Sequence, residues 1–214
     1  EHPFTVVMGG AKLEDKIKVI EKLLPLCDHL LLTGGIANTF LKALNINIGF
    51  SLCSNDEELI EKIKQILLQY RSKIVLPFDA IVGSSYDKEY TSLKMINKLD
   101  DNEIIYDLGH KTIEKYSIYL NESQTVFING TAGKYEDPRY ANGTKEILAA
   151  LNYSGANVIV GGGDCVAAVN KFNYKDAFTY LCTGGGASLD YIANGSLIAL
   201  EPLKKEENYE VLDF

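Results

Sequence analysis

At five places in this chain an apolar, β-prone run ends abruptly in glycine, and a helix-like stretch follows each of them. The corners are residues 5–8 before Gly9-Gly10, 30–33 before Gly34-Gly35, 126–129 before Gly130, 158–160 before glycines 161–163, and 180–183 before glycines 184–186. In a parallel α/β sheet all such corners lie on one edge, at the carboxyl ends of the strands, where ligands bind. Glycine lets the backbone approach a ligand closely, and the helix that follows offers free N–H groups to anions. The repeated corner therefore predicts a ligand that carries phosphate.

Strand-like and helix-like stretches alternate through the 214 residues. Strands are expected at 4–8, 30–32, 74–76, 126–128, 158–160 and 179–182, and helices at 12–24, 36–44, 55–70, 111–120, 144–151, 166–171 and 188–193. Residues 79–107 are more polar and predict a small β excursion rather than a second domain. The β-α-β-α order predicts a Rossmann-like, three-layer α/β fold in which helices cover both faces of a parallel sheet. We expect residues 1–214 to form a single domain that ends in a charged tail from Glu201.

The composition of the chain narrows the classes of partner that it can bind. The formal net charge of −8 argues against broad binding to nucleic acid, so local positive charge has to hold a phosphate ligand. No apolar run approaches the roughly 20 residues of a membrane span, and no signal peptide is visible. Cys27, Cys53, Cys165 and Cys182 are widely spaced without a C-x-x-C pair, which indicates reduced thiols rather than zinc ligands or disulfides. We therefore expect a cytoplasmic protein with no nucleic-acid or membrane partner.

Two lysines follow the first glycine corner. Lys12 and Lys16 are four residues apart in the expected first helix, a spacing that puts both ammonium groups on one helix face. Positive charge beside free helix N–H groups is a place for a polyphosphate, because each ammonium neutralises phosphate oxygens. Lysine pairs at this spacing are also common on exposed helix faces, so both interpretations stay open.

A carboxylate follows the fourth corner. Asp164 comes directly after three glycines at the expected start of a helix. A carboxylate there is unfavourable without a partner, and a hard cation such as Mg²⁺ that bridges phosphates is a natural one. The alternative is that Asp164 is the N-cap of the helix. The neighbouring Cys165 is either a reactive thiol near a helix N-terminus or, as we favour, a small buried residue.

Glu136 and the last glycine corner complete the candidate set. A carboxylate a few residues past a strand end can bind the two hydroxyls of a ribose, and the alternative is that Glu136 faces solvent before Pro138. Residues 184–186 are three glycines in succession, whose bare N–H groups can hold a transferring phosphoryl group. The alternative for this corner is a flexible turn.

Two familiar nucleotide motifs fail by spacing. No G-x-x-x-x-G-K-[ST] occurs, because Gly133-Lys134 is followed by Tyr135. The run from Gly161 approaches G-x-G-x-x-G but has Val166 where Gly or Ala belongs. This spacing disfavours a dinucleotide-dependent oxidoreductase.

The corners as a set resemble the carboxyl-terminal, nucleotide-binding domain of phosphoglycerate kinase. The resemblance rests on Gly9-Gly10-Ala11-Lys12 with Asp15-Lys16, Gly34-Gly35, Asn129-Gly130 with Gly133 and Glu136, Gly161-Gly162-Gly163-Asp164, and Thr183-Gly184-Gly185-Gly186-Ala187-Ser188. A family member has two lobes, of which the amino-terminal lobe binds 3-phosphoglycerate and the carboxyl-terminal lobe binds Mg-ADP or Mg-ATP. Only the second lobe has a counterpart in this chain. The resemblance therefore implies a fragment whose partner is the missing amino-terminal lobe.

The resemblance also implies a reaction and roles for residues. The reaction is phosphoryl transfer between 1,3-bisphosphoglycerate and ADP in glycolysis, by a monomer, with ADP/ATP as substrate and Mg²⁺ as cofactor. The fragment alone is expected to be inactive. Lys12, Gly185 and Gly186 would act on the transferring group, and Asp164 would hold Mg²⁺. The implied nucleotide contacts are Gly10, Ala11, Gly34, Gly35 and Gly109 at adenine, Asn129, Gly130, Ala132 and Glu136 around the ribose, and Lys16, Gly162, Gly163, Asp164 and Cys165 in the rest of the site.

Several positions depart from the family's pattern. Thr33 stands where a third glycine is usual, and Thr131 and His110 each replace a proline. Cys165 replaces a serine or threonine whose hydroxyl contacts a phosphate, and a thiol is a poorer donor. The alternative hypothesis is therefore a divergent, non-catalytic nucleotide-binding module on the same fold.

Overall fold

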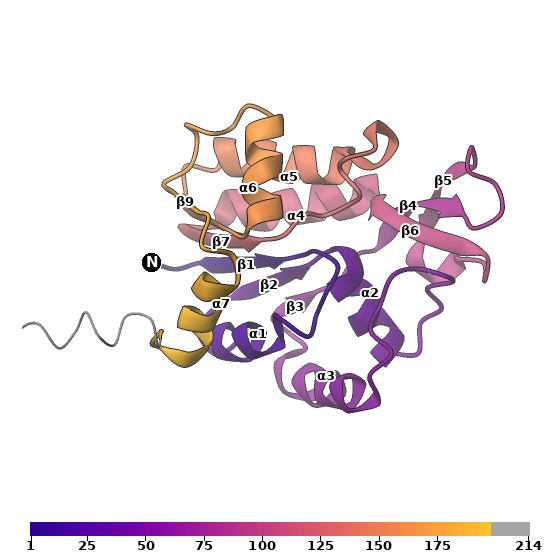
Figure 1. Cartoon of the computed structure of the whole chain (residues 1–214), viewed down its shortest axis with the longest axis horizontal. Coiled ribbons are helices and arrows are strands. Elements are labelled where there is room, and N and C mark those ends of the chain that lie inside the picture. Colours follow the sequence, from indigo (N-terminus) through magenta and orange to yellow (C-terminus); the bar gives the residue numbers. More distant parts are fainter. Residues whose placement is uncertain (198–214) are drawn as a thin grey trace, which may run out of the picture.

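The computed structural model describes residues 1–197, in which the central element is a six-stranded parallel sheet (Figure 1). The predicted tail from Glu201 lies outside these residues. The strands, in spatial order, are β3 (Ile74–Val75), β2 (His29–Leu32), β1 (Phe4–Met8), β7 (Thr125–Asn129), β8 (Asn157–Gly161) and β9 (Tyr180–Cys182). Strand order reverses between β1 and β7, which pair through Val6 and Phe127. These two strands therefore flank the topological switch point, where open α/β sheets bind ligands.

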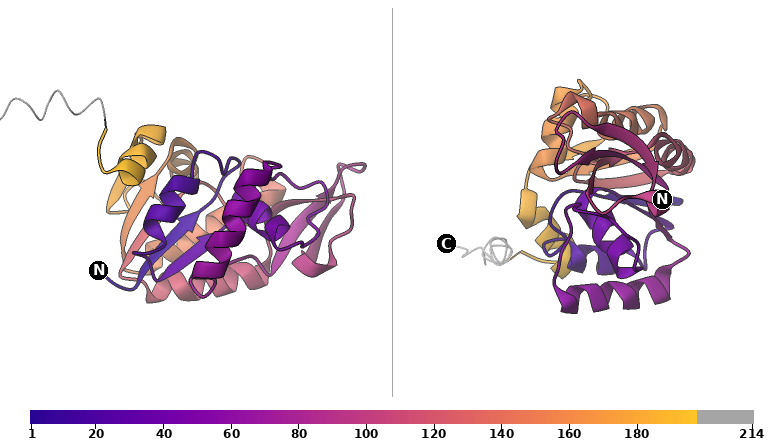
Figure 2. Two further views of the ribbon diagram at one scale, coloured as in Figure 1. Left: turned by 90° about the horizontal axis from the view of Figure 1, so that it is seen from below. Right: turned by 90° about the vertical axis from the view of Figure 1, so that its right-hand side faces the viewer.

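Helices cover both faces of the sheet (Figures 1 and 2). One face carries α1 (Ile17–Leu23), α2 (Gly34–Ala43), α3 (Glu57–Tyr70) and α7 (Gly185–Asn194), and the other carries α4 (His110–Glu122), α5 (Asn142–Tyr153) and α6 (Gly163–Lys171). Val6 and Met8 of β1 belong to the first core, and Val7 belongs to the second. Strands buried on both faces need such continuous apolar runs. The Rossmann-like three-layer prediction is confirmed, and no helix within residues 1–197 is long and apolar enough to cross a bilayer.

The β excursion is a separate three-stranded antiparallel sheet. It consists of β5 (Thr91–Met95), β4 (Asp79–Ser84) and β6 (Glu103–Leu108), with β4 in the middle. The predicted excursion around residues 79–107 is confirmed, although β5 has no counterpart among the predicted strands. The residues of β5 are exposed or half-buried, so this strand lacks the apolar run that would reveal it. In Figure 1 this sheet lies at the opposite end of the molecule from the amino terminus, beyond the carboxyl ends of the main strands.

Helix α1 begins five residues later than its sequence predicts. The prediction starts the helix at Lys12, whereas the structure starts it at Ile17. The intervening chain forms a turn in which the Lys16 N–H donates to the Leu13 carbonyl oxygen at 2.8 Å, and the Leu13 side chain enters the core. Burial of this leucine outweighs local helix propensity. Lys12 and Lys16 are therefore not on one helix face, which corrects the expectation from their spacing.

Helices α6 and α7 begin earlier than predicted. Their glycine-rich starts argue against helix on propensity alone, yet α6 begins at Gly163 and α7 at Gly185. The N-cap of α6 is Gly162, and Asp164 lies in the first turn. The alternative of Asp164 as N-cap is therefore wrong. Gly185 likewise belongs to a helix rather than to a loop.

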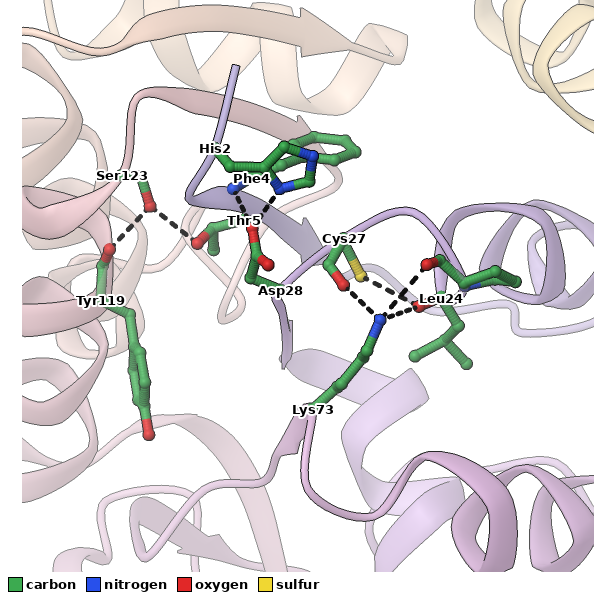
Figure 3. A network of polar contacts seen from close by, with 10 residues as sticks. His2, Phe4, Thr5, Leu24, Cys27, Asp28, Lys73, Tyr119 and Ser123 are labelled. Carbon is green, nitrogen blue, oxygen red and sulfur yellow. Dashed lines mark hydrogen bonds and ion pairs between the residues drawn. The ribbon is translucent and has the colours of Figure 1, made fainter.

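Polar contacts hold the other edge of the sheet, where the strands begin (Figure 3). Asp28 Oδ2 accepts a hydrogen bond from the Phe4 N–H at 2.6 Å and pairs with His2 Nδ1 at 2.6 Å. Lys73 Nζ donates to the last carbonyl oxygens after α1, those of Leu24 at 3.0 Å, Pro25 at 3.3 Å and Cys27 at 2.7 Å. These contacts satisfy orphaned helix-end carbonyls and tie β1, β2 and the start of β3 together.

Candidate functional site

Two cavities lie at the carboxyl edge of the main sheet. The β6 cavity, about 320 Å³, is bounded by the corners after β1 and β2, by β6 and by residues 131–136. The lysine cavity, about 370 Å³, is bounded by the ends of β7 and β8 and by the starts of α6 and α7, with Lys16 in its wall. Asp164 lines both. The two cavities therefore adjoin at this carboxylate.

The β6 cavity gathers most of the residues that the resemblance assigns to adenine, but only two of the four that it assigns around the ribose, because Asn129 and Gly130 lie in the wall of the lysine cavity instead. Its wall includes Gly10, Ala11, Gly34, Gly35, Ala132 and Glu136. The opposite wall comes from the antiparallel sheet, through residues 104–106, and from Leu52 in the α2–α3 connection. Asn38 holds this connection by donating from Nδ2 to the Leu52 carbonyl oxygen at 3.0 Å. One wall is therefore glycine backbone and the other is largely apolar side chain, as small-molecule sites commonly are.

The lysine cavity gathers most of the other predicted residues. Its wall contains Asn129 and Gly130 after β7, Gly162, Gly163 and Cys165 at the start of α6, and Gly185 and Gly186 at the start of α7. Two helix N-termini with free N–H groups thus border a cavity that also holds a lysine. This combination suits a phosphate-bearing ligand.

The Lys16 ammonium group lies at the switch point itself. Its Nζ donates to the carbonyl oxygen of Gly9 at 2.5 Å, after β1, and of Asn129 at 3.5 Å, at the end of β7. Gly130 has φ +92, and a Cβ on it would lie 2.2 Å from the Gly9 oxygen and 2.9 Å from Lys16 Nζ. Burial lowers the pKa of Lys16, while Asp164 and Asp15 act in the opposite direction. Backbone dipoles therefore hold this half-buried ammonium group.

Cys165 is a buried residue rather than a reactive thiol. It is 2% exposed in the first turn of α6. Burial raises the pKa of its thiol to about 12, although the Gly130 N–H bond and the Lys16 charge act in the opposite direction. The thiol is therefore neutral at physiological pH, which supports the favoured interpretation.

Two predicted site residues line neither cavity. Lys12 is exposed in the turn before α1. Gly109 precedes α4, and a Cβ on it would lie 2.2 Å from Asp79 Cγ, so close packing against that carboxylate explains the glycine. The expected contact of Gly109 with adenine has no support in its position.

Two threonines near the glycine corners, Thr33 and Thr131, contact each other. Thr33 Oγ1 donates to the carbonyl oxygen of Thr131 at 3.2 Å. This hydrogen bond joins the corner after β2 to the segment after β7. The two threonines therefore link two neighbouring segments at the edge of the site.

Sequence reasoning missed part of both cavities. In the β6 cavity these residues are Asn38, Leu52, Ile104, Ile105, Tyr106, Thr131, Gly133, Lys134 and Tyr135, and in the lysine cavity they are Asp15, Leu189 and Asp190. Some of these residues are neighbours in sequence of predicted site residues, and this is the one signal that could have identified them. Leu52 and residues 104–106 carry none, because they reach the cavity only where the α2–α3 connection and the antiparallel sheet face the glycine corners.

Comparisons with known proteins agree on one family. The model of the phosphoglycerate kinase family matches residues 1–195. The phosphoglycerate kinase of Lactobacillus delbrueckii subsp. bulgaricus is 41% identical over 197 residues, which are 92% of this chain and 48% of that protein. The phosphoglycerate kinase of Wigglesworthia glossinidia brevipalpis is 39% identical over 211 residues, 98% of this chain and 52% of that protein.

Solved structures give the same result. Phosphoglycerate kinase from Coxiella burnetii matches with a TM-score of 0.87 and 38% identity, over 95% of this chain and 53% of its own. Phosphoglycerate kinase from Pyrococcus horikoshii OT3 matches with a TM-score of 0.82 and 29% identity, over 95% of this chain and 52% of its own. The chain spans about half the length of the curated relatives it matches.

Proposed function

The chain belongs to the phosphoglycerate kinase family, and from this premise we propose that it is the Mg-ADP/ATP-binding half of such an enzyme. The observation that carries the proposal is the pair of cavities joined at Asp164. One cavity has apolar and glycine walls suited to a base and sugar, and the other has Lys16 and two helix N-termini suited to phosphates. A nucleoside diphosphate likewise consists of a base and sugar joined to phosphates, so its two parts match the two cavities.

Individual residues take roles that follow from their positions. The backbone at Gly10, Ala11, Gly34 and Gly35 would contact adenine, and Glu136 would accept hydrogen bonds from the ribose hydroxyls. Lys16 would bind the phosphates, since a phosphate oxygen supplies the negative partner that its two carbonyl acceptors lack.

Asp164 suits a magnesium ion that is held mainly by the nucleotide. Its carboxylate borders both cavities, so it is within the wall that a bound diphosphate would face. Within residues 1–197, no three His, Cys, Asp or Glu side chains are grouped closely enough to hold a metal ion. Mg²⁺ is commonly bound through one or two carboxylates, with phosphate oxygens and water completing its shell. When bound, the ion would neutralise charge on the phosphates.

Lys12, Gly185 and Gly186 are proposed to act on the transferring group. An oxygen of the ADP β-phosphate attacks the phosphoryl group of 1,3-bisphosphoglycerate, and the acyl carboxylate leaves; the reverse reaction uses ATP. The Lys12 charge and the N–H groups of Gly185 and Gly186 would stabilise the oxygens of the phosphoryl group during its transfer. The exposure of Lys12 fits a residue that meets its target when an amino-terminal lobe closes over this edge.

A non-catalytic nucleotide-binding module is the second candidate. The observation in its favour is Cys165, a buried neutral thiol at a position where family members carry a hydroxyl. A thiol is a weak donor to phosphate oxygens, so a member with this change could keep binding while losing rate.

Calorimetry of ADP binding, with and without Mg²⁺, tests the main proposal. The wild-type chain should bind Mg-ADP, and Asp164→Asn should weaken Mg-ADP about tenfold, or about 1.4 kcal/mol, while changing metal-free ADP at most about twofold. Asp176→Asn, an exposed carboxylate after α6, is the matched control and should change neither. No wild-type binding at millimolar ADP would refute the proposal, and equal losses for both ligand forms would remove Asp164 as the metal ligand.

A further inference from the structure

Two buried carboxylates outside the cavities have the same local arrangement. Asp79 and Asp107 are each 1% exposed, and each accepts hydrogen bonds from backbone N–H groups at the start of a helix. Asp79 accepts from Lys111 N at 3.1 Å and Thr112 N at 2.8 Å, in α4. Asp107 accepts from Gly143 N at 2.7 Å, in α5, and from its neighbour Leu108 N at 2.8 Å. Both therefore cap helices, and α4 and α5 pack against each other on one face of the main sheet (Figure 1).

Each cap is accompanied by a buried threonine that holds a second segment. Thr112 Oγ1 accepts from Phe78 N at 2.9 Å and Asp79 N at 3.1 Å, where β4 begins. Thr144 Oγ1 accepts from Ala132 N at 3.1 Å and Gly133 N at 3.4 Å. The two junctions are alike in these contacts, although Thr112 Oγ1 also donates to Asp79 Oδ1 at 2.7 Å, and they differ in the segment that they hold.

The segment held by Asp107 and Thr144 is the wall of the β6 cavity. All residues of the 131–136 loop line that cavity, Glu136 among them. A Cβ on Gly133 would lie 2.3 Å from Asp107 Oδ1, so the loop lies directly on this carboxylate. Lys134 N also donates to the Tyr106 carbonyl oxygen at 2.9 Å, next to Asp107 in β6. The loop is thus held between the end of β6 and the start of α5.

We propose that Asp107 and Thr144 are positioning residues, which hold the 131–136 loop in the conformation that binds the nucleoside part of the nucleotide. Neither residue lines the β6 cavity, so each acts through the loop. The inference rests on the proposed function. Asp79 and Thr112 form the matching junction without a cavity-lining segment, and they therefore have a purely structural role.

Asp107→Asn is the direct test. The two carboxylate oxygens accept from different N–H groups, and an amide can satisfy only one of them, so the second faces an NH₂ group. At about pH 8 the variant should bind ADP about tenfold more weakly than wild type, as expected for loss of a hydrogen bond to a charged group. Its affinity for inorganic pyrophosphate, a probe for the lysine cavity alone, should stay within about twofold.

Asp79→Asn is the matched control. It removes one of two backbone hydrogen bonds at an equally buried site, so it should lower the thermal midpoint while ADP affinity stays within about twofold. If the carboxylate variants do not fold, Thr144→Val and Thr112→Val form a near-isosteric pair with the same readouts, and only Thr144→Val should weaken ADP.

Three results would overturn the inference. The first is unchanged ADP affinity in Asp107→Asn while wild type binds ADP, which would leave the proposed function intact. The second is an equal loss in the Asp79 and Asp107 variants, which would indicate general destabilisation. The third is an equal loss of pyrophosphate and ADP binding. A wild-type chain that binds no ADP would overturn both this inference and the proposed function.

Discussion

At the scale of single residues, Lys16 has the most unusual environment in the site. Its ammonium group donates to the carbonyl oxygens at the ends of β1 and β7, and burial lowers the pKa of Lys16. Carbonyl oxygens carry no net charge, so they are weaker partners for an ammonium group than the charged oxygens of a phosphate. Lys16 is therefore prepared to exchange two backbone acceptors for an anion.

Lys16→Met should weaken ADP binding by about tenfold or more, because it removes a half-buried positive charge from the wall of the lysine cavity. Wild-type affinity should also fall as pH rises into the alkaline range. Its lowered pKa means that Lys16 loses its proton at a lower pH than an ordinary lysine, and the neutral amine no longer attracts phosphate. Calorimetry across pH measures both effects.

Lys18→Met is the control for this prediction, since Lys18 is exposed on α1. It should keep the wild-type affinity and the alkaline decline. An unchanged ADP affinity in Lys16→Met would mean that the ammonium group serves only to join β1 to β7.

At the scale of elements, the junction of β6 with α5 ties the antiparallel sheet to the main domain. Asp107 near the end of β6 accepts from the Gly143 N–H of α5. Burial raises the pKa of Asp107 to about 7, against the backbone hydrogen bonds from Gly143, Leu108 and Asn142, which act to lower it. A carboxyl group placed between two elements in this way makes their attachment dependent on pH.

The sign of this dependence follows from proton binding. The pKa of Asp107 in the fold, about 7, exceeds its ordinary value of 3.8, so the folded chain binds the proton more tightly than the unfolded chain. The contribution of Asp107 to the free energy of unfolding is therefore greatest near pH 4 and falls as pH rises to about 7, by at most about 4 kcal/mol.

Urea unfolding of wild type and Asp107→Asn across this pH range isolates the contribution, because asparagine does not titrate. The wild-type free energy of unfolding, minus that of the variant, should decline from about pH 4.5 to about pH 7 and then stay level. A difference independent of pH would show that the carboxylate is ionised throughout, held so by the backbone N–H groups.

At the scale of the whole molecule, the chain corresponds to half of its relatives. The two cavities open at the carboxyl edge of the sheet, and the proposed function assigns both of them to the nucleotide. Phosphoryl transfer depends on holding donor and acceptor in line, so this chain should bind nucleotide without catalysing the transfer.

The 214-residue chain assayed alone should bind Mg-ADP without measurable phosphoryl transfer. Fusing it to the amino-terminal half of the Lactobacillus delbrueckii relative should restore transfer, measured as ATP formed from 1,3-bisphosphoglycerate and ADP. Lys12→Ala in the fusion should slow transfer more than it weakens ADP binding, as expected for a group that acts in the transition state. A correctly folded fusion that binds both substrates but transfers nothing would favour the non-catalytic module.

The sequence by itself determined the main sheet and most of the site's composition. Buried parallel strands are continuous apolar runs, and the glycines that end them mark the binding edge, so both are readable locally. The glycine corners predict Gly10, Gly34 and Asp164 in this way, the family resemblance adds Asn129, and the structure brings all four to the walls of the two cavities.

Only the tertiary structure decided which segments form the far wall of the site and where its lysine side chains lie. Burial of Leu13 delays α1 and separates Lys12 from Lys16, although their spacing predicts a common helix face. The polar segment that forms the antiparallel sheet supplies residues 104–106 as the far wall of the β6 cavity. The physical reason is that local propensity and periodicity describe neighbours along the chain, whereas a cavity wall and the position of the Lys16 ammonium group depend on contacts between residues distant in sequence.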